Sequence, residues 1–539
     1  MTQRSTPIRD MHNAAFRAAE KSAARAWLRA LEMTAGIDAA RERIFPVIVE
    51  ELGARHGEAP ALLARDESLS HAELGARANR YARWALERNI AKGERVCLLM
   101  PNRPDYLAVW LGLSRVGAVV ALLNTNLSGN ALAHCIQAAN ARHIIVDDGL
   151  FVLLEGLETG ARVWRHDRDF AGAIAAYPGG PLTERERRAV TLGDPALLIY
   201  TSGTTGLPKA AFVSHHRVMM WTHWFAGMMD ASVEDRLYNC LPMYHSVGGV
   251  VASGAILLKG GAVILREKFS VSGFWDDIAA SGATIFQYIG ELCRYLLNSN
   301  IEPPPHRLRL ICGNGLSADI WEAFQARFHI PQVLEFYAAT EGNFSLYNAE
   351  GKPGAIGRVP GFLRHRFGLA LVARAEDGEI WRGPDGFCRK TAPGETGEAI
   401  GRIADGAARF EGYSDAEATD KKILRHVFAP GDAWFRTGDL MRQDEQGFYY
   451  FVDRLGDTFR WKGENVATAE VSAALTAYPG ILAASVYGVA LPGADGKAGM
   501  AALETNGDFD RRGLPAWLAG RLPSYARPLF LRLVPALSV

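Results

Sequence analysis

The chain has 539 residues, of which 48% are hydrophobic, and its 59 basic and 59 acidic side chains give a formal net charge of zero. A chain of this length is too long for one hydrophobic core and should divide into two or more domains. The balanced charge argues against a dedicated nucleic-acid-binding protein, which normally carries a basic face. The six cysteines are scattered, with no CxxC pair. We therefore expect neither a disulfide framework nor a zinc site, and a soluble protein of the reducing cytosol.

The N-terminal segment is predicted to form an Ala-rich helix over about residues 14–31, with basic side chains along one side. Such a helix could lie on an anionic membrane surface. The favoured alternative is that its apolar stripe, which includes Trp27, packs against its own domain, because alanine adds little insertion energy. The most apolar stretch, 248–265, is broken by Lys259 and two glycines, and it predicts a buried helix and a strand. A membrane-spanning transporter is therefore disfavoured.

From residue 60 to about residue 450, short apolar runs alternate with stretches of helical character. In chain order the sequence predicts a strand, a helix, a strand, a helix and a strand at residues 96–100, 104–116, 118–123, 129–139 and 144–146. Alternation of this kind is typical of parallel sheets with helices on both faces. Turn residues become more frequent after residue 353, and we expect short antiparallel strands between residues 356 and 452.

The predicted domain boundary follows the hydrophobic strand 448–452, where the sequence DRLGD introduces charge and a glycine. The remaining segment is predicted to contain a helix, two strands and a helix at residues 469–477, 484–489, 500–503 and 514–521. The sequence therefore predicts an α/β protein. A large N-terminal domain, residues 1–452, would hold helix-covered, mostly parallel sheets and a small β-rich subdomain. A small α+β lid would follow at residues 453–539.

The most specific motif is YTSGTTGLPK at residues 200–209, which directly follows an apolar strand. Its glycines allow the backbone to turn and to approach a ligand closely. Hydroxyl and backbone N–H groups of such a loop can surround phosphate oxygens, and its lysine adds a compact positive charge. The motif differs from the GxxxxGK[ST] loop of P-loop NTPases. We interpret it as a nucleotide-phosphate loop with the candidate residues Thr201, Ser202, Gly203, Thr204, Thr205, Gly206 and Lys209.

This loop resembles the phosphate loop of the adenylate-forming superfamily, which includes acyl-CoA synthetases, firefly luciferase and nonribosomal adenylation domains. FYAATEG at residues 336–342 is similar to the aromatic-Gly-x-Thr-Glu motif of that superfamily, with Ala338 in place of the usual glycine. The resemblance implies that Tyr337 stacks on adenine, Thr340 contacts the α-phosphate and Glu341 holds Mg²⁺. A carboxylate suits a hard cation that bridges phosphates. Taken alone, a Thr-Glu pair would more often be a helix cap.

Motifs later in the chain are similar to the ribose and lid motifs of the same superfamily. WFRTGDL at residues 434–440 implies that Asp439 receives the ribose hydroxyls, although a bare Thr-Gly-Asp is a common turn. Arg454 is expected on ribose or phosphate. RWKGENV at residues 460–466 lies where the superfamily carries its lid motif, so Arg460 and Lys462 would face the active site after the lid rotates.

Two earlier segments complete the resemblance. Gly313-Asn314-Gly315 resembles the adenine-side loop, and LPMYHSVGG at residues 241–249 resembles the segment that bears a histidine or aromatic gate. The second similarity implies that His245 lies near the substrate carboxylate, whereas a lone histidine is more often structural. Residues 287–290 and the aromatic cluster 221–225 are candidates for the lining of an acyl tunnel, with a plain core role as the equal alternative.

Within the superfamily, DRLGDTFRWKGENVAT at residues 453–468 and YAATEGN at residues 337–343 are most similar to the group of fatty-acid transport proteins and very-long-chain acyl-CoA synthetases. The resemblance implies a fatty acid–CoA ligase that uses ATP and Mg²⁺ to form an acyl-adenylate, transfers the acyl group to CoA, and releases AMP and pyrophosphate. A bulky steroid-like or aromatic acid is a second candidate substrate, and carrier-protein phosphopantetheine a second candidate acceptor.

The alternative from another class is a fatty-acid-binding or uptake protein with little turnover. We expect a cytoplasmic location, with peripheral contact at the inner face of a membrane as a hypothesis.

One expected motif is missing from the end of the lid. Adenylating members carry a lysine there, whereas the last lysine of this sequence is Lys497, in the different context PGADGK. The sequence therefore predicts a chain that is truncated or naturally short. Such a chain should keep its nucleotide site and adenylate poorly.

Overall fold

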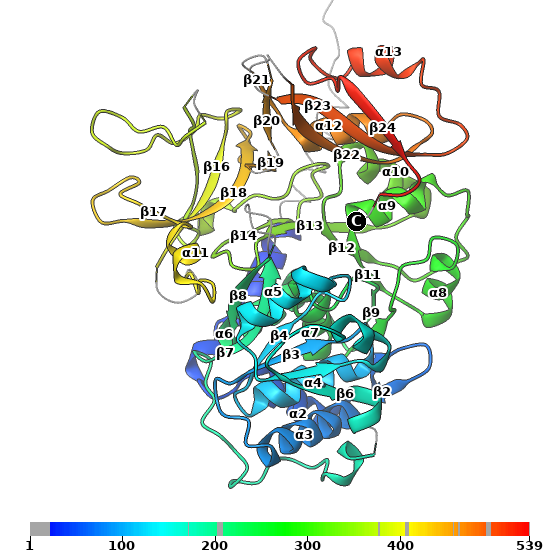
Figure 1. Cartoon of the computed structure of the whole chain (residues 1–539), viewed down its shortest axis with the longest axis vertical. Helices are drawn as coiled ribbons and strands as arrows, with labels where there is room; N and C mark the ends of the chain where they lie inside the picture. Colours follow the sequence, from blue (N-terminus) through cyan, green and yellow to red (C-terminus); the bar gives the residue numbers. More distant parts are fainter. Residues whose placement is uncertain are drawn as a thin grey trace, which may run out of the picture. The chain divides into compact units, whose positions relative to one another are not determined.

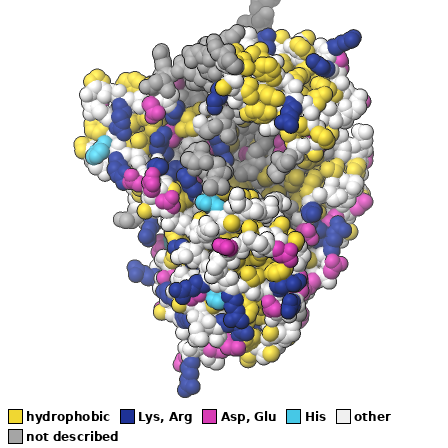
Figure 2. All heavy atoms as spheres, in the orientation of Figure 1, with side chains coloured by type: hydrophobic (Ala, Val, Ile, Leu, Met, Phe, Trp, Pro, Cys, Tyr) yellow, Lys and Arg dark blue, Asp and Glu magenta, His cyan; other side chains and the backbone are white. Residues whose placement is uncertain are grey.

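The structure is a computed structural model that describes residues 22–170, 172–201, 208–375, 378–404, 409–455, 458–461, 464–491 and 497–537. The chain forms two compact units (Figure 1). The first unit comprises residues 1–367 and 403–423, and the second unit comprises residues 368–402 and 424–539. On the face seen in Figure 2, basic and acidic side chains are interspersed, as the balanced composition predicts.

The first unit contains a six-stranded sheet in the order β6-β5-β3-β4-β7-β8, in which every pair is parallel except β7–β8. Its strands are β3 (Arg95–Leu99), β4 (Val119–Leu122), β5 (His143–Val146), β6 (Arg162–Arg165), β7 (Pro195–Thr201) and β8 (Lys209–Ser214). The helices that alternate with them are α3 (His71–Glu87), α4 (Pro104–Arg115) and α5 (Gly129–Ala139). The alternation expected between residues 96 and 146 is therefore confirmed.

A second sheet in the same unit has eight strands in the order β14-β13-β12-β11-β9-β10-β1-β2, and only its two outer pairs are antiparallel. The strands are β1 (Pro60–Leu63), β2 (Ser68–Ser70), β9 (Arg236–Asn239), β10 (Ala262–Leu265), β11 (Ile285–Ile289), β12 (Leu310–Asn314), β13 (Gln332–Ala338) and β14 (Ser345–Asn348). The accompanying helices are α2 (Phe45–His56), α6 (His215–Met228), α7 (Ala252–Leu258), α8 (Phe274–Ser281), α9 (Gly290–Asn298) and α10 (Ala318–Phe328).

One large hydrophobic core joins the two sheets of the first unit. Val96 of β3 and Leu310 of β12 both belong to it, whereas their neighbours Cys97 and Ile311 face separate cores on the far sides of the sheets. Successive side chains of a strand point to opposite faces, so strands buried on both sides must be apolar throughout. Burial on both faces explains the near-continuous apolar runs of the sequence.

The described part of the N-terminal helix, residues 22–34, packs inside the first unit. Trp27 is fully buried, and its ring meets the rings of Trp224, Tyr347 and Phe367 edge-on at centroid distances of 5.5–5.7 Å. The predicted packing of the apolar stripe is thus confirmed for these residues, and residues 14–21 lie outside the described part. No helix among the described residues has the length and apolar character that a bilayer crossing requires. The stretch 248–265 forms a π-helix (Val247–Val251), α7 and β10.

The second unit combines an antiparallel sheet with a small α+β segment. The sheet contains β15 (Leu369–Val372), β16 (Thr396–Arg402), β17 (Ile423–Arg425), β18 (Ala433–Gln443) and β19 (Tyr449–Arg454). The α+β segment contains the hairpin β20 (Phe459–Trp461) and β21 (Glu464–Val466), helices α12 (Thr468–Thr476) and α13 (Leu514–Ala519), and a three-stranded sheet of β22 (Ile481–Ala490), β23 (Lys497–Thr505) and β24 (Phe530–Val534). The expected boundary at Asp453 lies within β19, and a lid that moves from this point stays a prediction.

Candidate functional site

The predicted phosphate loop connects two paired strands of the first unit. Thr201 ends β7 and faces Lys209, the first residue of β8, in the antiparallel register. Both side chains are half-buried. The five remaining loop candidates, Ser202, Gly203, Thr204, Thr205 and Gly206, lie outside the described residues. The structure therefore places the two ends of the loop together at the edge of the sheet.

Glu341 and Thr340 occupy the turn between β13 and β14, and Glu341 is buried. This turn is held by Arg217 of α6, whose guanidinium donates to the carbonyl oxygens of Thr340 (2.7 Å) and Gly342 (3.0 Å). The Thr340 hydroxyl also lies 3.1 Å from that of Ser246. A planar guanidinium can bridge two acceptors at once, so Arg217 sets the conformation of the Thr-Glu turn.

Tyr413 joins the phosphate loop to this turn, and the sequence analysis did not identify it. The backbone of residues 412–414 runs along β8, with Phe212 N donating to Gly412 O and Ser414 N donating to Ala210 O. The buried Tyr413 hydroxyl donates to the Glu341 carboxylate over 2.7 Å and also forms a hydrogen bond with the Thr201 side chain. No motif surrounds this tyrosine, so its role depends on a contact between residues 72 positions apart.

The electrostatics of this cluster keep Tyr413 protonated. Burial and the nearby Glu341 carboxylate raise the pKa of the Tyr413 hydroxyl above its ordinary value. The Lys209 ammonium lies 5.9 Å from the centroid of the Tyr413 ring. Thr201, Lys209 and Glu341 are thus gathered around one tyrosine, with a cation, a carboxylate and hydroxyl groups available for a phosphate ligand.

The predicted adenine-side residues lie near the ends of adjacent strands. Tyr337 is half-buried near the end of β13, with its ring 5.8 Å from that of Phe344. Gly313 and Asn314 end β12, which pairs with β13, and Gly315 follows with φ +83°. His245 is exposed beside the Tyr244 ring, at a centroid distance of 4.6 Å. Its neighbour Ser246 lies against the Thr340 turn, with the two hydroxyl oxygens 3.1 Å apart.

The second unit holds the predicted ribose residues. Asp439 on β18 faces Arg454 on β19, and the Arg454 Nε lies 3.3 Å from the buried Asp439 carboxylate. Asp453 is also buried, and its carboxylate accepts from the Thr468 N–H at the start of α12 over 2.6 Å. The backbone of Arg460 lies in β20, whereas its side chain and all of Lys462 lie outside the described residues.

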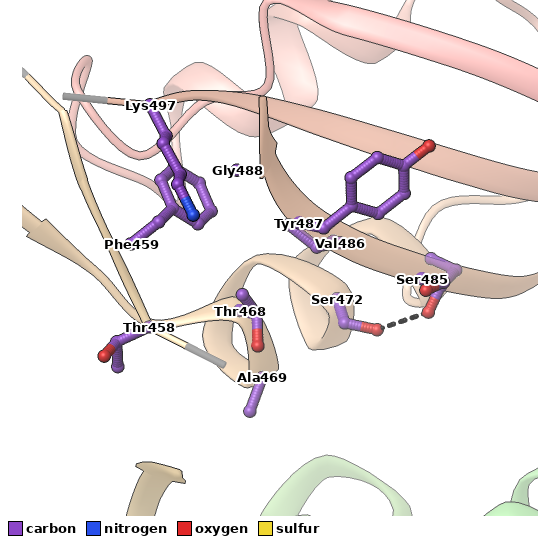
Figure 3. A pocket seen from close by; sticks show the side chains of 11 residues that line it. Thr458, Phe459, Thr468, Ala469, Ser472, Ser485, Val486, Tyr487, Gly488 and Lys497 are labelled. Atoms are coloured by element: carbon purple, nitrogen blue, oxygen red, sulfur yellow. Dashed lines mark hydrogen bonds between the residues drawn. The ribbon is translucent and has the colours of Figure 1, made fainter. Parts of the chain in front are cut away.

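A polar hollow of about 510 Å³ opens in the second unit, between β20, α12 and β22 (Figure 3). The Ser472 hydroxyl donates to the Ala484 carbonyl oxygen over 2.8 Å. Lys497 is the positively charged residue of the lining. The lining residues include five that bear hydroxyl groups, Thr458, Thr468, Ser472, Ser485 and Tyr487. None of the predicted site residues that the structure describes lines this hollow, so we assign it no part in the chemistry.

The donor set around Glu341 fits a magnesium ion that is bound mainly by a substrate. Mg²⁺ prefers oxygen ligands and keeps several waters, so one carboxylate and phosphate oxygens suffice. Within the part of the chain that the structure describes, no three His, Cys, Asp or Glu side chains gather as a metal site. Glu341 would hold the cation together with oxygens of a phosphate ligand.

Comparison with known proteins identifies relatives over most of the chain. The family model described as AMP-binding enzyme matches residues 49–384. The mouse long-chain fatty acid transport protein 1 is 39% identical over 516 residues, which cover 91% of this chain and 79% of that protein. The medium/long-chain-fatty-acid–CoA ligase FadD6 of Mycobacterium tuberculosis is 38% identical over 504 residues, which cover 91% of this chain and 82% of that protein.

Solved structures agree with the sequence matches. ATP-bound MatB from Rhodopseudomonas palustris superposes with a TM-score of 0.75 at 25% identity, over 92% of this chain and 95% of that chain. The anthranilate CoA ligase AuaEII in complex with anthranoyl-AMP has a TM-score of 0.78 at 19% identity, over 92% and 94% of the two chains. The second likeness bears on the fold alone.

Proposed function

Because the chain belongs to the AMP-binding enzyme family, we propose that it is an AMP-forming acyl-CoA synthetase that activates long-chain or very-long-chain fatty acids. The observation that carries this proposal is the cluster of Thr201, Lys209 and Glu341 around Tyr413. These groups suit the phosphates of ATP. The names of the relatives support a fatty acid as the substrate.

In the proposed first step, a carboxylate oxygen of the fatty acid attacks the α-phosphorus of ATP. The new P–O bond gives the acyl-adenylate, and the bond to pyrophosphate breaks. The nucleophile is already an anion, so no general base is needed, and the enzyme must position both substrates and neutralise charge. Lys209 and the hydroxyl of Thr201 would contact the phosphates, and Glu341 would hold Mg²⁺, which neutralises charge on the phosphate oxygens.

Several side chains have narrower proposed roles. Thr340 would contact the α-phosphate, Tyr337 would stack on adenine, and His245 would face the substrate carboxylate. In the second unit, Asp439 and Arg454 would bind the ribose, and their ion pair of 3.3 Å holds the buried carboxylate in a fixed orientation. The lid residues Arg460 and Lys462 would act in the second step.

In that second step, the thiol sulfur of CoA releases its proton to solvent and attacks the acyl carbonyl carbon. The thioester forms, the bond between the acyl carbon and the adenylate oxygen breaks, and AMP leaves with the bonding electrons. A phosphopantetheine thiol on a carrier protein would react in the same way. A bulky steroid-like or aromatic acid remains the second candidate substrate. The relatives called transport proteins favour a second function, in which the protein retains fatty acid with little turnover.

The deciding experiment is ATP–pyrophosphate exchange with acids from short to very long chain, measured with and without CoA. We expect exchange that depends on Mg²⁺ and is strongest for one long chain-length class. A Glu341→Gln variant should lose most of the exchange and still bind ATP in the absence of Mg²⁺. Binding of fatty acid and ATP without any exchange would favour the retention function, and no binding of ATP would overturn the proposed synthetase.

A further inference from the structure

Glu335 is a buried carboxylate that contacts the predicted adenine-side loop. It lies on β13, two residues before Tyr337, and its side chain is 2% exposed. Its Oε1 accepts from the backbone N–H groups of Gly315 (2.5 Å) and Leu316 (3.3 Å). Its Oε2 accepts from the hydroxyl of Tyr288 on β11, which β12 separates from β13 in the sheet. One side chain thus binds a loop and two strands together.

The opposite side of the loop has no free space. A Cβ on Gly313 would lie 2.1 Å from the carbonyl oxygen of Tyr288, and a Cβ on Gly290 would lie 1.9 Å from that of Gly315. Gly315 itself has φ +83°, which a residue with a side chain rarely adopts. The loop is therefore pressed against β11 and α9, and its N–H groups point inward, where a buried donor needs an acceptor. Glu335 provides that acceptor.

Both ionisation states of Glu335 keep an acceptor for the loop. Burial raises the pKa of Glu335 to about 8, against the hydrogen bonds from Tyr288 and the loop, which lower it. A protonated carboxyl group would still offer Oε1 to Gly315 and Leu316, while its O–H turns to Tyr288. A glutamine has the same shape and the same acceptor, so it imitates the protonated form.

We propose that Glu335 is a positioning residue that fixes the Gly313–Gly315 loop relative to Tyr337 and thereby sets the selectivity for adenine. This inference rests on the proposed nucleotide site. The strand that carries the stacking ring also carries the carboxylate that holds the loop, so the spacing between the ring and the loop is fixed by one element. Adenine presents a donor at N6 where guanine presents an acceptor at O6, and a loop whose backbone groups are held in place can distinguish them.

The test uses variants of Glu335 that differ in whether they keep an acceptor for the loop. Glu335→Leu removes this acceptor. Glu335→Asp moves the carboxylate away from the loop by the length of one methylene group, and Glu335→Gln keeps an acceptor oxygen in place. Tyr288→Phe is the matched control, because it removes the third hydrogen bond and leaves the loop contact intact. Dissociation constants for ATP and GTP are measured for each full-length variant, with thermal unfolding as the check on folding.

We expect Glu335→Leu and Glu335→Asp to bind ATP about tenfold more weakly, which corresponds to a loss of about 1.4 kcal/mol of binding free energy. The affinity for GTP should change little. The ratio of the affinity for ATP to the affinity for GTP should therefore fall in these two variants. Glu335→Gln and Tyr288→Phe should keep the wild-type affinity ratio. A folded Glu335→Leu or Glu335→Asp variant with the wild-type ratio would overturn the inference. An equal loss for both nucleotides would overturn it too, because a purely structural role predicts that result. A wild-type protein that binds no ATP would instead reject the proposed function.

Discussion

The hydroxyl of Tyr413 donates a hydrogen bond of 2.7 Å to the carboxylate of Glu341, across 72 residues of sequence. The tyrosine belongs to the segment 412–414, which lies beside β8 in space, and the glutamate belongs to the turn after β13. The same tyrosine is hydrogen-bonded to Thr201. The contact therefore connects the loop expected to hold phosphate with the carboxylate expected to hold its metal ion.

Replacing Tyr413 with phenylalanine should impair nucleotide activation without unfolding the protein. The change removes one donor from a charged acceptor, which is worth about 1.5–3 kcal/mol, so we expect kcat/KM for ATP to fall about tenfold or more. KM for the fatty acid should change little. Tyr450→Phe is the matched control, because its hydroxyl also donates to a carboxylate, that of Asp444, over 2.9 Å. Equal activity of Tyr413→Phe and wild type would contradict the role given to Tyr413.

Arg217→Lys tests whether the Thr340–Glu341 turn is set by the guanidinium. Arg217 is 7% exposed and bonds to the carbonyl oxygens of Thr340, Gly342 and Arg409. A lysine keeps the charge and cannot bridge these acceptors in the same plane. We expect a loss of about 1–3 kcal/mol of stability together with a raised Mg²⁺ requirement. A stability loss with an unchanged Mg²⁺ titration would show that Arg217 acts on the fold alone.

Gln287→Leu should leave stability unchanged or raise it by about 1 kcal/mol. The Gln287 side chain is fully buried on β11, and among the described residues neither its amide oxygen nor its amide nitrogen has a hydrogen-bond partner. Its neighbour in the register, Asn239, provides the control. The Asn239 amide donates to Gly248 O and accepts from Leu241 N, so Asn239→Leu should destabilise the protein. Urea unfolding of both variants measures this difference, and a large loss in Gln287→Leu would contradict the expectation.

The raised pKa of Glu335 should make the stability of the protein depend on pH. Its pKa is about 8 in the folded chain and near 4.5 when exposed. Between these values the folded chain binds a proton that the unfolded chain does not. The wild type therefore loses stability as the pH rises through this window, by a few kcal/mol in all.

The variant Glu335→Gln cannot titrate at this position and isolates the effect. We expect the stability of Glu335→Gln relative to wild type to increase from pH 5 to pH 8 and to level off above pH 9. Paired urea titrations at each pH measure the difference, in which other titrating groups cancel. A difference that does not vary with pH would show that Glu335 is ionised throughout the range.

The sequence by itself determined the features that depend on short-range patterns. The alternation of strands and helices between residues 96 and 146 was predictable because strands buried on both faces are apolar and turns interrupt them, and α5 has the predicted bounds Gly129–Ala139. The adjacent pair Thr340–Glu341 could be recognised as a candidate motif through its resemblance, and the role given to it stays a prediction. The packing of Trp27 followed from the apolar stripe of its helix.

Only the tertiary structure decided which distant groups meet these motifs. Tyr413, Arg217 and Glu335 carry no local signature, and their partners lie 72, 123 and 20 residues away along the chain. Sheet order brings β12 beside β13 and the segment 412–414 beside β8, and no periodicity in the sequence encodes that order. A hydrogen bond needs its two atoms within about 3 Å, so such partners become visible only when the chain has folded.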